Sequence, residues 1–327
     1  MAFDYRSVGF IGLGAMGKPM AGHLAEVLPK ECTIWVYDIL EYSLHEFCSK
    51  YAERSKKAAS AKEVAENCEI ILTMLPESAH VRDAYLDPRT GICASPSSLA
   101  NKLIIDHSTI DTATSSLIAF HITSISPSTS FYDAPVSGGV NGAISGTLAI
   151  FLGCAPTDPQ LPRLMSLLST FAAQIIPCGA PTYGLAAKLS NNYLSGIIAI
   201  AASEAFTMGM KAGLDPRVLA RVYAASTAQN AVVDRFCPVP GVWHEAPSSR
   251  GYRDGFGVEL MRKDFALAGE MAQRVGAQNV LGEVGRAIYE EAERDEACSG
   301  LDSRVVLRLL GGDERWMNRP GDWEERG

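Results

Sequence analysis

The chain has 327 residues and carries 29 Lys and Arg against 37 Asp and Glu, a formal net charge of −8 at pH 7. Its hydrophobic fraction of 47% and charged fraction of 20% are typical of a globular protein with room for two cores. Because no stretch gathers Lys and Arg into a block, we expect no nucleic-acid partner. The eight cysteines form no CxxC pair and the six histidines no HxxxH pair, so we expect neither a metal site nor a disulfide framework.

Short apolar runs alternate with helix-like segments in the first half of the chain. The run 7–11 ends at a glycine-rich turn, and residues 19–28 after that turn have apolar side chains at helical spacing. Later candidate strands are 33–37, 69–75, 103–106, 130–132, 148–152 and 174–176. Strands that alternate with helices predict an α/β fold, here a Rossmann-type doubly wound, mostly parallel sheet with helices on both faces.

Strand signals end near Pro181, and the second half is predicted to be all α-helical, joined to the first by a long helix. The expected helices are 183–212, 216–227, 263–275, 280–295 and 303–310. This pattern divides the chain into a dinucleotide-binding domain (1–180), an all-α substrate and dimerisation domain (181–312) and a polar, frayed tail (313–327).

The most apolar stretch, residues 193–206, is too short to span a bilayer and carries Glu204, so we interpret it as a buried helix and expect no membrane partner. The first strand begins by about residue 7, which leaves no room for a signal or transit peptide. We therefore expect a soluble intracellular protein, in the cytoplasm or the mitochondrial matrix.

The glycine-rich turn has the GxGxxG spacing of a dinucleotide-binding site, and its residues are Gly12, Leu13, Gly14, Ala15, Met16 and Gly17. The motif alone is weak evidence, but here a strand precedes it and a helix comes after it. The first glycine permits the tight turn, the second lets the backbone approach a diphosphate, and the third lets helix and strand pack closely. The alternative is an accidental glycine turn.

Asp38 ends the second predicted strand, 21 residues beyond Gly17. A carboxylate at this position accepts hydrogen bonds from both ribose hydroxyls and repels a 2′-phosphate, so it selects NAD over NADP. No arginine follows it directly. The alternative is an ordinary aspartate that begins a turn.

Lys188 and Asn192 are the candidate catalytic pair. They lie four residues apart on the predicted helix, so they project from the same face. Apolar neighbours would desolvate the lysine and lower its pKa from about 10.4 toward the working pH, which suits a general base for alcohol oxidation. Taken alone, however, a helical lysine is more often a surface residue whose stem covers apolar side chains.

Several motifs along the chain resemble the β-hydroxyacid dehydrogenase family, and most closely its 3-hydroxyisobutyrate dehydrogenase branch. The similarity runs from about residue 8 to residue 310. Its motifs are Gly12-Leu-Gly-Ala-Met-Gly-Lys-Pro-Met20, Thr73-Met-Leu-Pro76, Asp106-His-Ser-Thr-Ile110, Asp133-Ala-Pro-Val-Ser-Gly-Gly-Val140, the Lys188 helix, Pro238-Val-Pro-Gly-Val242 and Gly255-Phe-Gly-Val-Glu-Leu-Met-Arg-Lys-Asp264.

The resemblance implies roles for residues of the first half. Leu75, Pro76 and Thr109 would contact the cofactor. Ser137, Gly138 and Gly139 would hold the substrate carboxylate, which agrees with the anion-binding capacity of consecutive backbone N–H groups at a Gly-Gly turn. Without the resemblance, a plain turn would be the simpler interpretation of these three residues.

The resemblance also makes Lys188 the catalytic acid and base and Asn192 a substrate ligand. Lys263 would reach the cofactor or the substrate carboxylate, with Asp264 orienting it. Phe256 would cover the nicotinamide, although a core aromatic is an equal alternative. His107 and Cys237 depart from the family's usual residues, and we interpret His107 as a loop histidine without a role.

We therefore predict NAD-dependent oxidation of the primary alcohol of 3-hydroxyisobutyrate to methylmalonate semialdehyde, a step of valine catabolism. Alternatives are a reductase of glyoxylate, succinic semialdehyde or tartronate semialdehyde, an imine reductase, and a non-catalytic NAD-binding module. The apolar helix and the family resemblance indicate a homodimer or homotetramer formed through the helical domain.

Overall fold

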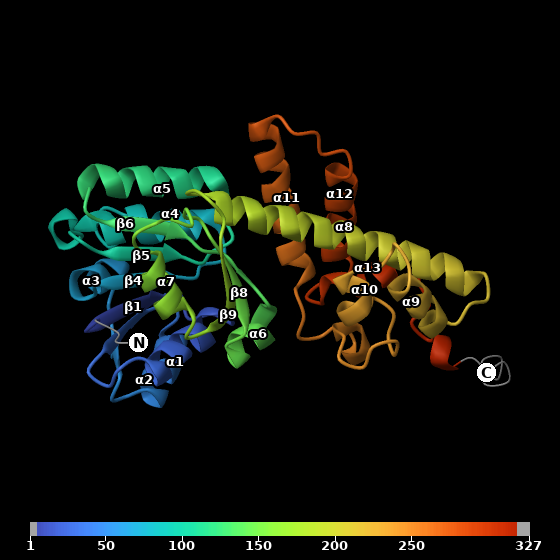
Figure 1. Cartoon of the computed structure of the whole chain (residues 1–327). Coiled ribbons are helices and arrows are strands. Elements are labelled where there is room, and N and C mark those ends of the chain that lie inside the picture. The colour runs from blue at the N-terminus through green and yellow to red at the C-terminus, as the bar shows by residue number, and fades with distance from the viewer. Residues whose placement is uncertain (1–4, 319–327) are drawn as a thin grey trace. The chain divides into compact units, whose positions relative to one another are not determined.

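Six strands of the first half form a parallel sheet with the order β3-β2-β1-β4-β5-β6. The computed structural model describes residues 5–318, and most of its helices and strands are labelled in Figure 1. The strands are β1 (Ser7–Ile11), β2 (Thr33–Tyr37), β3 (Ser55–Lys57), β4 (Ile70–Thr73), β5 (Leu103–Asp106) and β6 (Ser130–Asp133). This strand order is that of a Rossmann domain, so the predicted fold class of the first half is confirmed.

Helices cover both faces of this sheet. They are α1 (Gly17–Val27), α2 (Glu41–Lys50) and α7 (Leu161–Leu168) on one face, and α3 (Ala61–Asn67), α4 (Ser78–Leu86) and α5 (Thr112–Ile125) on the other. Strand β4 shows why two cores form, because successive side chains of a strand point to opposite faces. Ile70 and Leu72 pack with α1, whereas Ile71 packs with α3, α4 and α5.

A second, three-stranded sheet comes after β6. It contains β7 (Val136–Ser137), β8 (Leu148–Leu152) and β9 (Ala172–Pro177), with α6 (Gly139–Ser145) between β7 and β8. Strand β7 runs antiparallel to β8, and β9 runs parallel to it. The sequence pattern located β8 and β9 but assigned them to the main sheet. The structure separates them because the chain leaves that sheet after Asp133 and pairs next through the two-residue strand β7.

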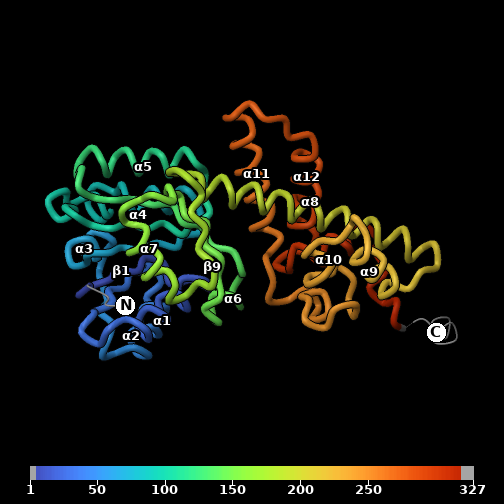
Figure 2. The backbone as a smooth tube through the Cα atoms, in the orientation of Figure 1, coloured from blue at the N-terminus to red at the C-terminus, as the bar shows by residue number. Residues whose placement is uncertain are grey.

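The second half is helical, as predicted. Its helices are the long α8 (Tyr183–Lys211), α9 (Pro216–Ala224), α10 (Ala231–Phe236), α11 (Val258–Val275), α12 (Gly282–Arg294) and α13 (Val306–Leu309). Internal contacts divide the chain into residues 1–188 and 189–327, so α8 begins in the first unit and continues into the second. Figure 2 traces this unbroken backbone. The domain boundary predicted near residue 180 stays a prediction.

Phe265 of α11 is the centre of one core of the helical half. Its ring lies 5.4 Å from that of Tyr193 and 5.2 Å from that of Tyr289, measured between centroids. Gly196 and Gly285 permit this packing, because a Cβ atom on either would lie within 2.4 Å of the Phe265 ring. The part of α8 around Tyr193 and Gly196 is therefore packed against α11 and α12.

Helix α8 has 29 residues and an 18-residue window of mean hydropathy 1.3, and 44% of that window is buried within the protein. By length and composition alone such a helix could cross a membrane. A core helix of a water-soluble protein meets the same test, and α8 contributes Phe206 and Met210 to a buried cluster. The bounds of α8 agree with the helix 183–212 expected from the sequence, which contains the apolar stretch 193–206.

Three details of the helical half differ from the sequence expectations. Helix α11 begins at Val258 rather than near residue 263, and the short α10 was not expected. Trp316 lies in the segment expected to fray, yet its side chain is buried and donates a hydrogen bond from Nε1 to the Pro240 carbonyl at 2.8 Å. Residues 319–327 of the expected tail lie outside the described residues.

Candidate active site

The carboxyl ends of five parallel strands meet at one edge of the main sheet, and predicted site residues come after each of them. They are Gly12–Gly17 after β1, Asp38 after β2, Leu75 and Pro76 after β4, Thr109 after β5, and Ser137–Gly139 after β6. In open α/β sheets, ligands bind outside this edge. The fold therefore brings the predicted site residues that come after β1, β2, β4 and β5 to one edge of the main sheet, whereas Ser137–Gly139 stand at the end of β7 in the second sheet.

The glycine turn has the space that a dinucleotide requires. Gly12 has φ +95°, and a Cβ atom there would lie 2.3 Å from the Met74 carbonyl oxygen. A Cβ atom on Gly17 would lie 1.9 Å from the Gly12 carbonyl oxygen, so helix and turn pack without side chains. At Gly14 a Cβ atom would meet nothing within 4 Å. The turn is thus closed at Gly12 and Gly17 and open at Gly14, which fits a diphosphate approaching the backbone.

Asp38 ties the glycine turn to the end of β2. Its Oδ2 accepts a hydrogen bond from the Leu13 N–H at 2.6 Å, and its Oδ1 accepts one from the Leu40 N–H at 2.7 Å. An ionised carboxylate has about four acceptor positions, so two of them are left for ribose hydroxyls. This geometry fits the predicted role of Asp38 in selecting NAD.

Removing the charge of Asp38 tests that role. In Asp38→Asn we expect the ratio of kcat/KM with NAD to kcat/KM with NADP to fall by about tenfold or more, because less charge repels a 2′-phosphate. Steady-state kinetics with both cofactors measures the ratio. Glu41→Gln is the control, since Glu41 is an exposed carboxylate three residues away that pairs with Lys57. An unchanged ratio in Asp38→Asn would contradict the assignment.

A buried network joins the ends of β4 and β5. Asp106 Oδ1 accepts hydrogen bonds from Thr73 Oγ1 at 2.7 Å and from Ser108 Oγ at 2.6 Å. Ser108 Oγ in turn accepts the Leu75 N–H at 2.8 Å. Burial raises the pKa of Asp106 from 3.8 to about 6, and the hydroxyl hydrogen bonds oppose this rise. Asp106 thus fixes the segment that carries Leu75, and sequence reasoning had not assigned it a role.

The raised pKa of Asp106 makes folding depend on pH. Because the folded state binds this proton more tightly than the unfolded state, the stabilisation is complete below about pH 4 and is lost as the pH rises through about 6. Asp106→Asn does not titrate. We therefore expect the free energy of unfolding of the wild type, relative to this variant, to fall by roughly 3 kcal/mol between about pH 4 and 7. Urea denaturation over this range measures the difference, and a constant difference would contradict the prediction.

His107 is not the loop histidine without a role that the sequence indicated. Its ring is fully buried, Nδ1 donates a hydrogen bond to the Ala134 carbonyl at 2.7 Å, and the Phe171 ring meets it edge-on. Burial lowers its pKa from 6.5 to about 4, so the ring is neutral at physiological pH. His107 therefore joins the end of β5 to the segment after β6.

The predicted carboxylate clamp has the backbone of an anion-binding turn. Gly138 has φ +135° and Gly139 has φ +63°, and both residues are exposed. Ser137 precedes them at the end of β7. A side chain at position 138 would be strained by its backbone conformation and would lie 3.0 Å from Leu148. The exposure of both glycines fits the predicted binding of a carboxylate by their N–H groups.

Lys188 and Asn192 lie one helical turn apart on α8, and each side chain is only 6% exposed. Asn192 Nδ2 donates a hydrogen bond to Asp264 Oδ2 at 2.5 Å, and Lys263 Nζ lies 3.5 Å from Asp264 Oδ1. Asp264 of α11 is itself buried. The burial of Lys188 disagrees with the alternative of a surface lysine, and Asp264 holds both Asn192 and Lys263 in place.

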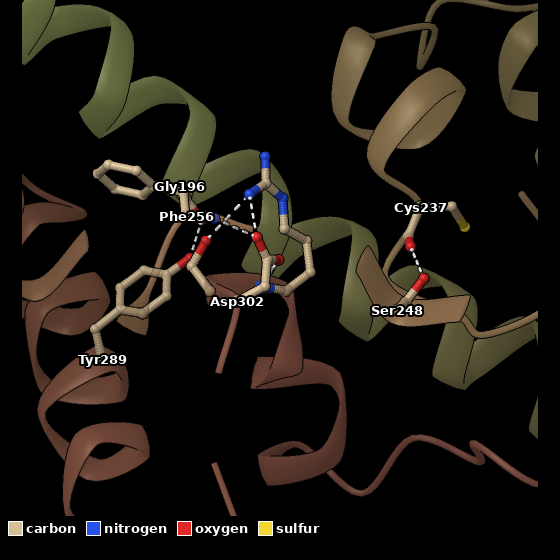
Figure 3. A network of polar contacts seen from close by, with 8 residues as sticks. Gly196, Cys237, Ser248, Phe256, Tyr289 and Asp302 are labelled. Atoms are coloured by element: carbon tan, nitrogen blue, oxygen red, sulfur yellow. Dashed lines mark hydrogen bonds and ion pairs between the residues drawn. The ribbon is translucent and has the colours of Figure 1, made fainter. Parts of the chain in front are cut away.

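Phe256 precedes α11 in a loop that is held by Asp302. The Phe256 N–H donates to Asp302 Oδ2 at 2.7 Å, and Arg304 Nη1 lies 3.0 Å from the same oxygen. Figure 3 shows Asp302 beneath Phe256, with Tyr289 directed at the Gly196 carbonyl. The figure also shows Cys237, whose carbonyl accepts a hydrogen bond from Ser248 Oγ at 2.6 Å. The backbone at Phe256 is thus fixed by Asp302, which immediately precedes the 3-10 helix Ser303–Val305.

Within residues 5–318, no group of three or more His, Cys, Asp or Glu side chains is arranged to hold a metal ion.

Comparisons with known proteins agree with this geometry. Residues 7–179 match the family model of the NAD binding domain of 6-phosphogluconate dehydrogenase, and residues 183–310 match that of the NAD-binding domain of NADP-dependent 3-hydroxyisobutyrate dehydrogenase. The chain is 36% identical over 283 residues to the mitochondrial 3-hydroxyisobutyrate dehydrogenase of Mus musculus, covering 86% of this chain and 80% of that protein. It is 32% identical to the NAD-dependent L-serine dehydrogenase of Pseudomonas aeruginosa, covering 93% and 98%.

A solved structure is similar over nearly the whole chain. The 3-hydroxyisobutyrate dehydrogenase of Mycobacterium tuberculosis with L-serine has a TM-score of 0.84 and 31% identity, covering 94% of this chain and 99% of that one. The fold and these similarities together define an NAD-binding oxidoreductase with a Rossmann domain and a helical domain. The chain belongs to the 3-hydroxyisobutyrate dehydrogenase family of NAD-dependent β-hydroxyacid dehydrogenases, which confirms the resemblance seen in the sequence.

Proposed function

We propose that the enzyme oxidises 3-hydroxyisobutyrate to methylmalonate semialdehyde with NAD. The observation that carries this proposal is the buried pair Lys188 and Asn192 on one face of α8, with Asp264 bonded to Asn192. The Rossmann turn, the Gly138-Gly139 turn and the relatives named for this reaction support it.

The proposed roles follow from the chemistry of each group. Ser137 and the N–H groups of Gly138 and Gly139 bind the substrate carboxylate. Asn192 binds the substrate hydroxyl without adding charge, and Lys188 Nζ, as the neutral amine, accepts the hydroxyl proton and becomes an ammonium. Bound NAD would supply the acceptor for the hydride that leaves the carbon bearing the hydroxyl. The alcohol thus loses two electrons and two hydrogens, and the C–O single bond becomes the aldehyde carbonyl.

The remaining proposed contacts concern the cofactor. We propose that the six residues of the glycine turn, Asp38, Leu75, Pro76 and Thr109 contact the cofactor. We also propose cofactor contacts for Phe256 and Lys263, with Asp264 orienting Lys263. Burial of Asp264 and its bonds to Asn192 and Lys263 support this last role.

L-serine is the second candidate substrate. It is favoured by the Pseudomonas aeruginosa relative, a NAD-dependent L-serine dehydrogenase, and by the Mycobacterium tuberculosis enzyme, whose structure was solved with L-serine. L-serine has the same carboxylate and primary alcohol as 3-hydroxyisobutyrate but carries an ammonium where the latter has a methyl group. The reductases of short semialdehydes remain weaker alternatives, because Asp38 disfavours the NADP that several of them use.

A substrate panel tests the proposal. We expect kcat/KM for 3-hydroxyisobutyrate to exceed that for L-serine and for 4-hydroxybutyrate by about tenfold or more, because a site shaped for a methyl group leaves the serine ammonium unpaired. Each substrate is assayed with NAD and with NADP. A higher kcat/KM for L-serine would contradict the substrate assignment and leave the β-hydroxyacid class intact.

We further propose a homodimer or homotetramer formed through the helical domain. Exposed apolar residues of that domain, Leu194, Met208, Leu214 and Val222, support this assembly. The compartment we propose is the cytoplasm or the mitochondrial matrix, since the relatives include mitochondrial and bacterial enzymes.

A further inference from the structure

Asp133, the last residue of β6, binds the start of α8 with both of its carboxylate oxygens. Oδ1 accepts the Thr182 N–H at 2.7 Å, and Oδ2 accepts the Leu185 N–H at 2.8 Å. These N–H groups belong to the beginning of a 29-residue helix, where backbone N–H groups have no partner within the helix. The side chain of Asp133 therefore caps α8 from 49 residues away in the sequence.

The side chain of Asp133 is closely packed against the start of α8. The side chain is buried, with 2% of its surface exposed. A Cβ atom on Gly153 would lie 1.8 Å from Asp133 Oδ1, and one on Gly184 would lie 2.9 Å from Oδ2 and 2.2 Å from the Phe151 carbonyl oxygen. Thr182 has φ +69°, a left-handed conformation that disfavours threonine. Both glycines and this conformation bring the helix start directly against the carboxylate.

The position of Asp133 in the chain connects this cap to the proposed chemistry. Lys188 lies three residues after Leu185, less than one helical turn. Ser137 lies four residues after Asp133 and begins the Ser137-Gly138-Gly139 turn. The same residue thus fixes the helix that carries the proposed proton acceptor and begins the segment that holds the substrate carboxylate.

We propose that Asp133 is a positioning residue for catalysis, which sets where Lys188 stands relative to the carboxylate-binding turn. The inference rests on the proposed function, because it assumes that Lys188 accepts the proton. Asp133 acts through the backbone of α8. Loss of its carboxylate therefore displaces Lys188 while leaving the Gly12–Gly17 turn and Asp38 unchanged. Proton transfer is sensitive to such a displacement, since a shift of about 1 Å can lower a rate by about 10²-fold.

Asp133→Asn tests the inference, because the amide offers an acceptor to one N–H group and faces the other with a donor. We expect kcat to fall by about 10- to 100-fold and the Kd of NADH to change by less than about twofold. Asp215→Asn is the matched control: Asp215 is also a buried aspartate that caps a helix, accepting the Arg217 N–H at 2.7 Å, but α9 carries no site residue. We expect its kcat to equal that of the wild type.

A double-mutant cycle with Lys188→Ala separates positioning from a loss of stability. If Asp133 acts through Lys188, adding Asp133→Asn to Lys188→Ala lowers the residual rate by less than about twofold, measured in single turnovers with enzyme in excess. The inference would be overturned if Asp133→Asn lowered the rate by the same factor in the wild type and in Lys188→Ala. It would also be overturned if Asp133→Asn alone kept more than half of the wild-type kcat. If Lys188→Ala itself keeps more than a few per cent of the wild-type kcat, the proposed function fails instead.

The cycle is repeated with Asp133→Ser, which keeps one acceptor oxygen, if Asp133→Asn does not fold. Hydrogen exchange gives an independent readout in either variant. We expect faster exchange of the backbone amides of residues 182–188 and unchanged exchange in α1, because only the start of α8 loses its cap. Unchanged exchange at 182–188 would show that Asp133 does not hold the helix, and would also overturn the inference.

Discussion

Lys188→Ala is expected to lower kcat by about 10²- to 10⁴-fold, the range that a general acid or base contributes. The variant removes the amine that we propose accepts the hydroxyl proton. Lys188 is buried on α8, with 6% of its surface exposed, so the alanine variant has no other amine at this position to accept the proton. Steady-state NADH formation with saturating 3-hydroxyisobutyrate measures the effect.

Lys211→Ala is the control for this variant, because Lys211 is an exposed lysine in the last turn of the same helix. Its kcat should match that of the wild type. If Lys188→Ala kept more than a few per cent of the wild-type kcat, another group would have to accept the proton, since loss of the acid–base group predicts a fall of about 10²-fold or more.

Gly14→Ala is expected to weaken NADH binding by about tenfold or more without destabilising the protein. A Cβ atom at position 14 meets nothing within 4 Å in the protein, so the fold accepts alanine. The same methyl group would occupy the space through which we expect the diphosphate to approach the backbone. Fluorescence titration with NADH gives the Kd, and thermal unfolding should give a Tm within about 2 °C of the wild type.

Gly17→Ala provides the contrast, because a Cβ atom there would lie 1.9 Å from the Gly12 carbonyl oxygen. That variant should lose both NADH affinity and thermal stability, since turn and helix must move apart. A Gly14→Ala protein that binds NADH as tightly as the wild type would show that the dinucleotide does not cross the turn at this residue.

The sequence predicted the parts of the fold that depend on local pattern. Buried strands such as β1 and β5 are apolar runs bounded by turns, and their predicted bounds match the structure. The glycine turn and Asp38 were found for a similar reason, because spacing along the chain determines which residues stand at the end of each parallel strand. The Rossmann class was predicted from these local signals.

Strands and helices that depend on their neighbours were missed. Strand β3 has the sequence Ser-Lys-Lys, which favours no strand, and it forms because β2 offers a pairing edge. Strand β7 has only two residues. The position of α10 likewise depends on packing within the helical half, where Val233 joins the cluster around Phe206. No periodic pattern over so few residues could have indicated them.

The buried carboxylates that support the site could not be assigned from the sequence either. Asp106, Asp133 and Asp302 each accept a hydrogen bond from a residue that lies between 33 and 52 residues away in the sequence. The longest of these separations is that between Asp133 and Leu185. Such pairs appear only when the sheet or the helices bring distant segments together. The one signal present in the sequence was that Asp106 and Asp133 each begin a family motif directly at a strand end.

Transfer of isotope from substrate to cofactor tests the central claim most directly. The wild-type enzyme is incubated with NAD and 3-hydroxyisobutyrate carrying deuterium at both positions of its alcohol carbon, and both products are analysed by mass spectrometry. The account predicts one deuterium in NADH and one retained on the semialdehyde, because the hydride leaves from that carbon while Lys188 takes only the hydroxyl proton. NADH without deuterium, or no NADH at all, would contradict it.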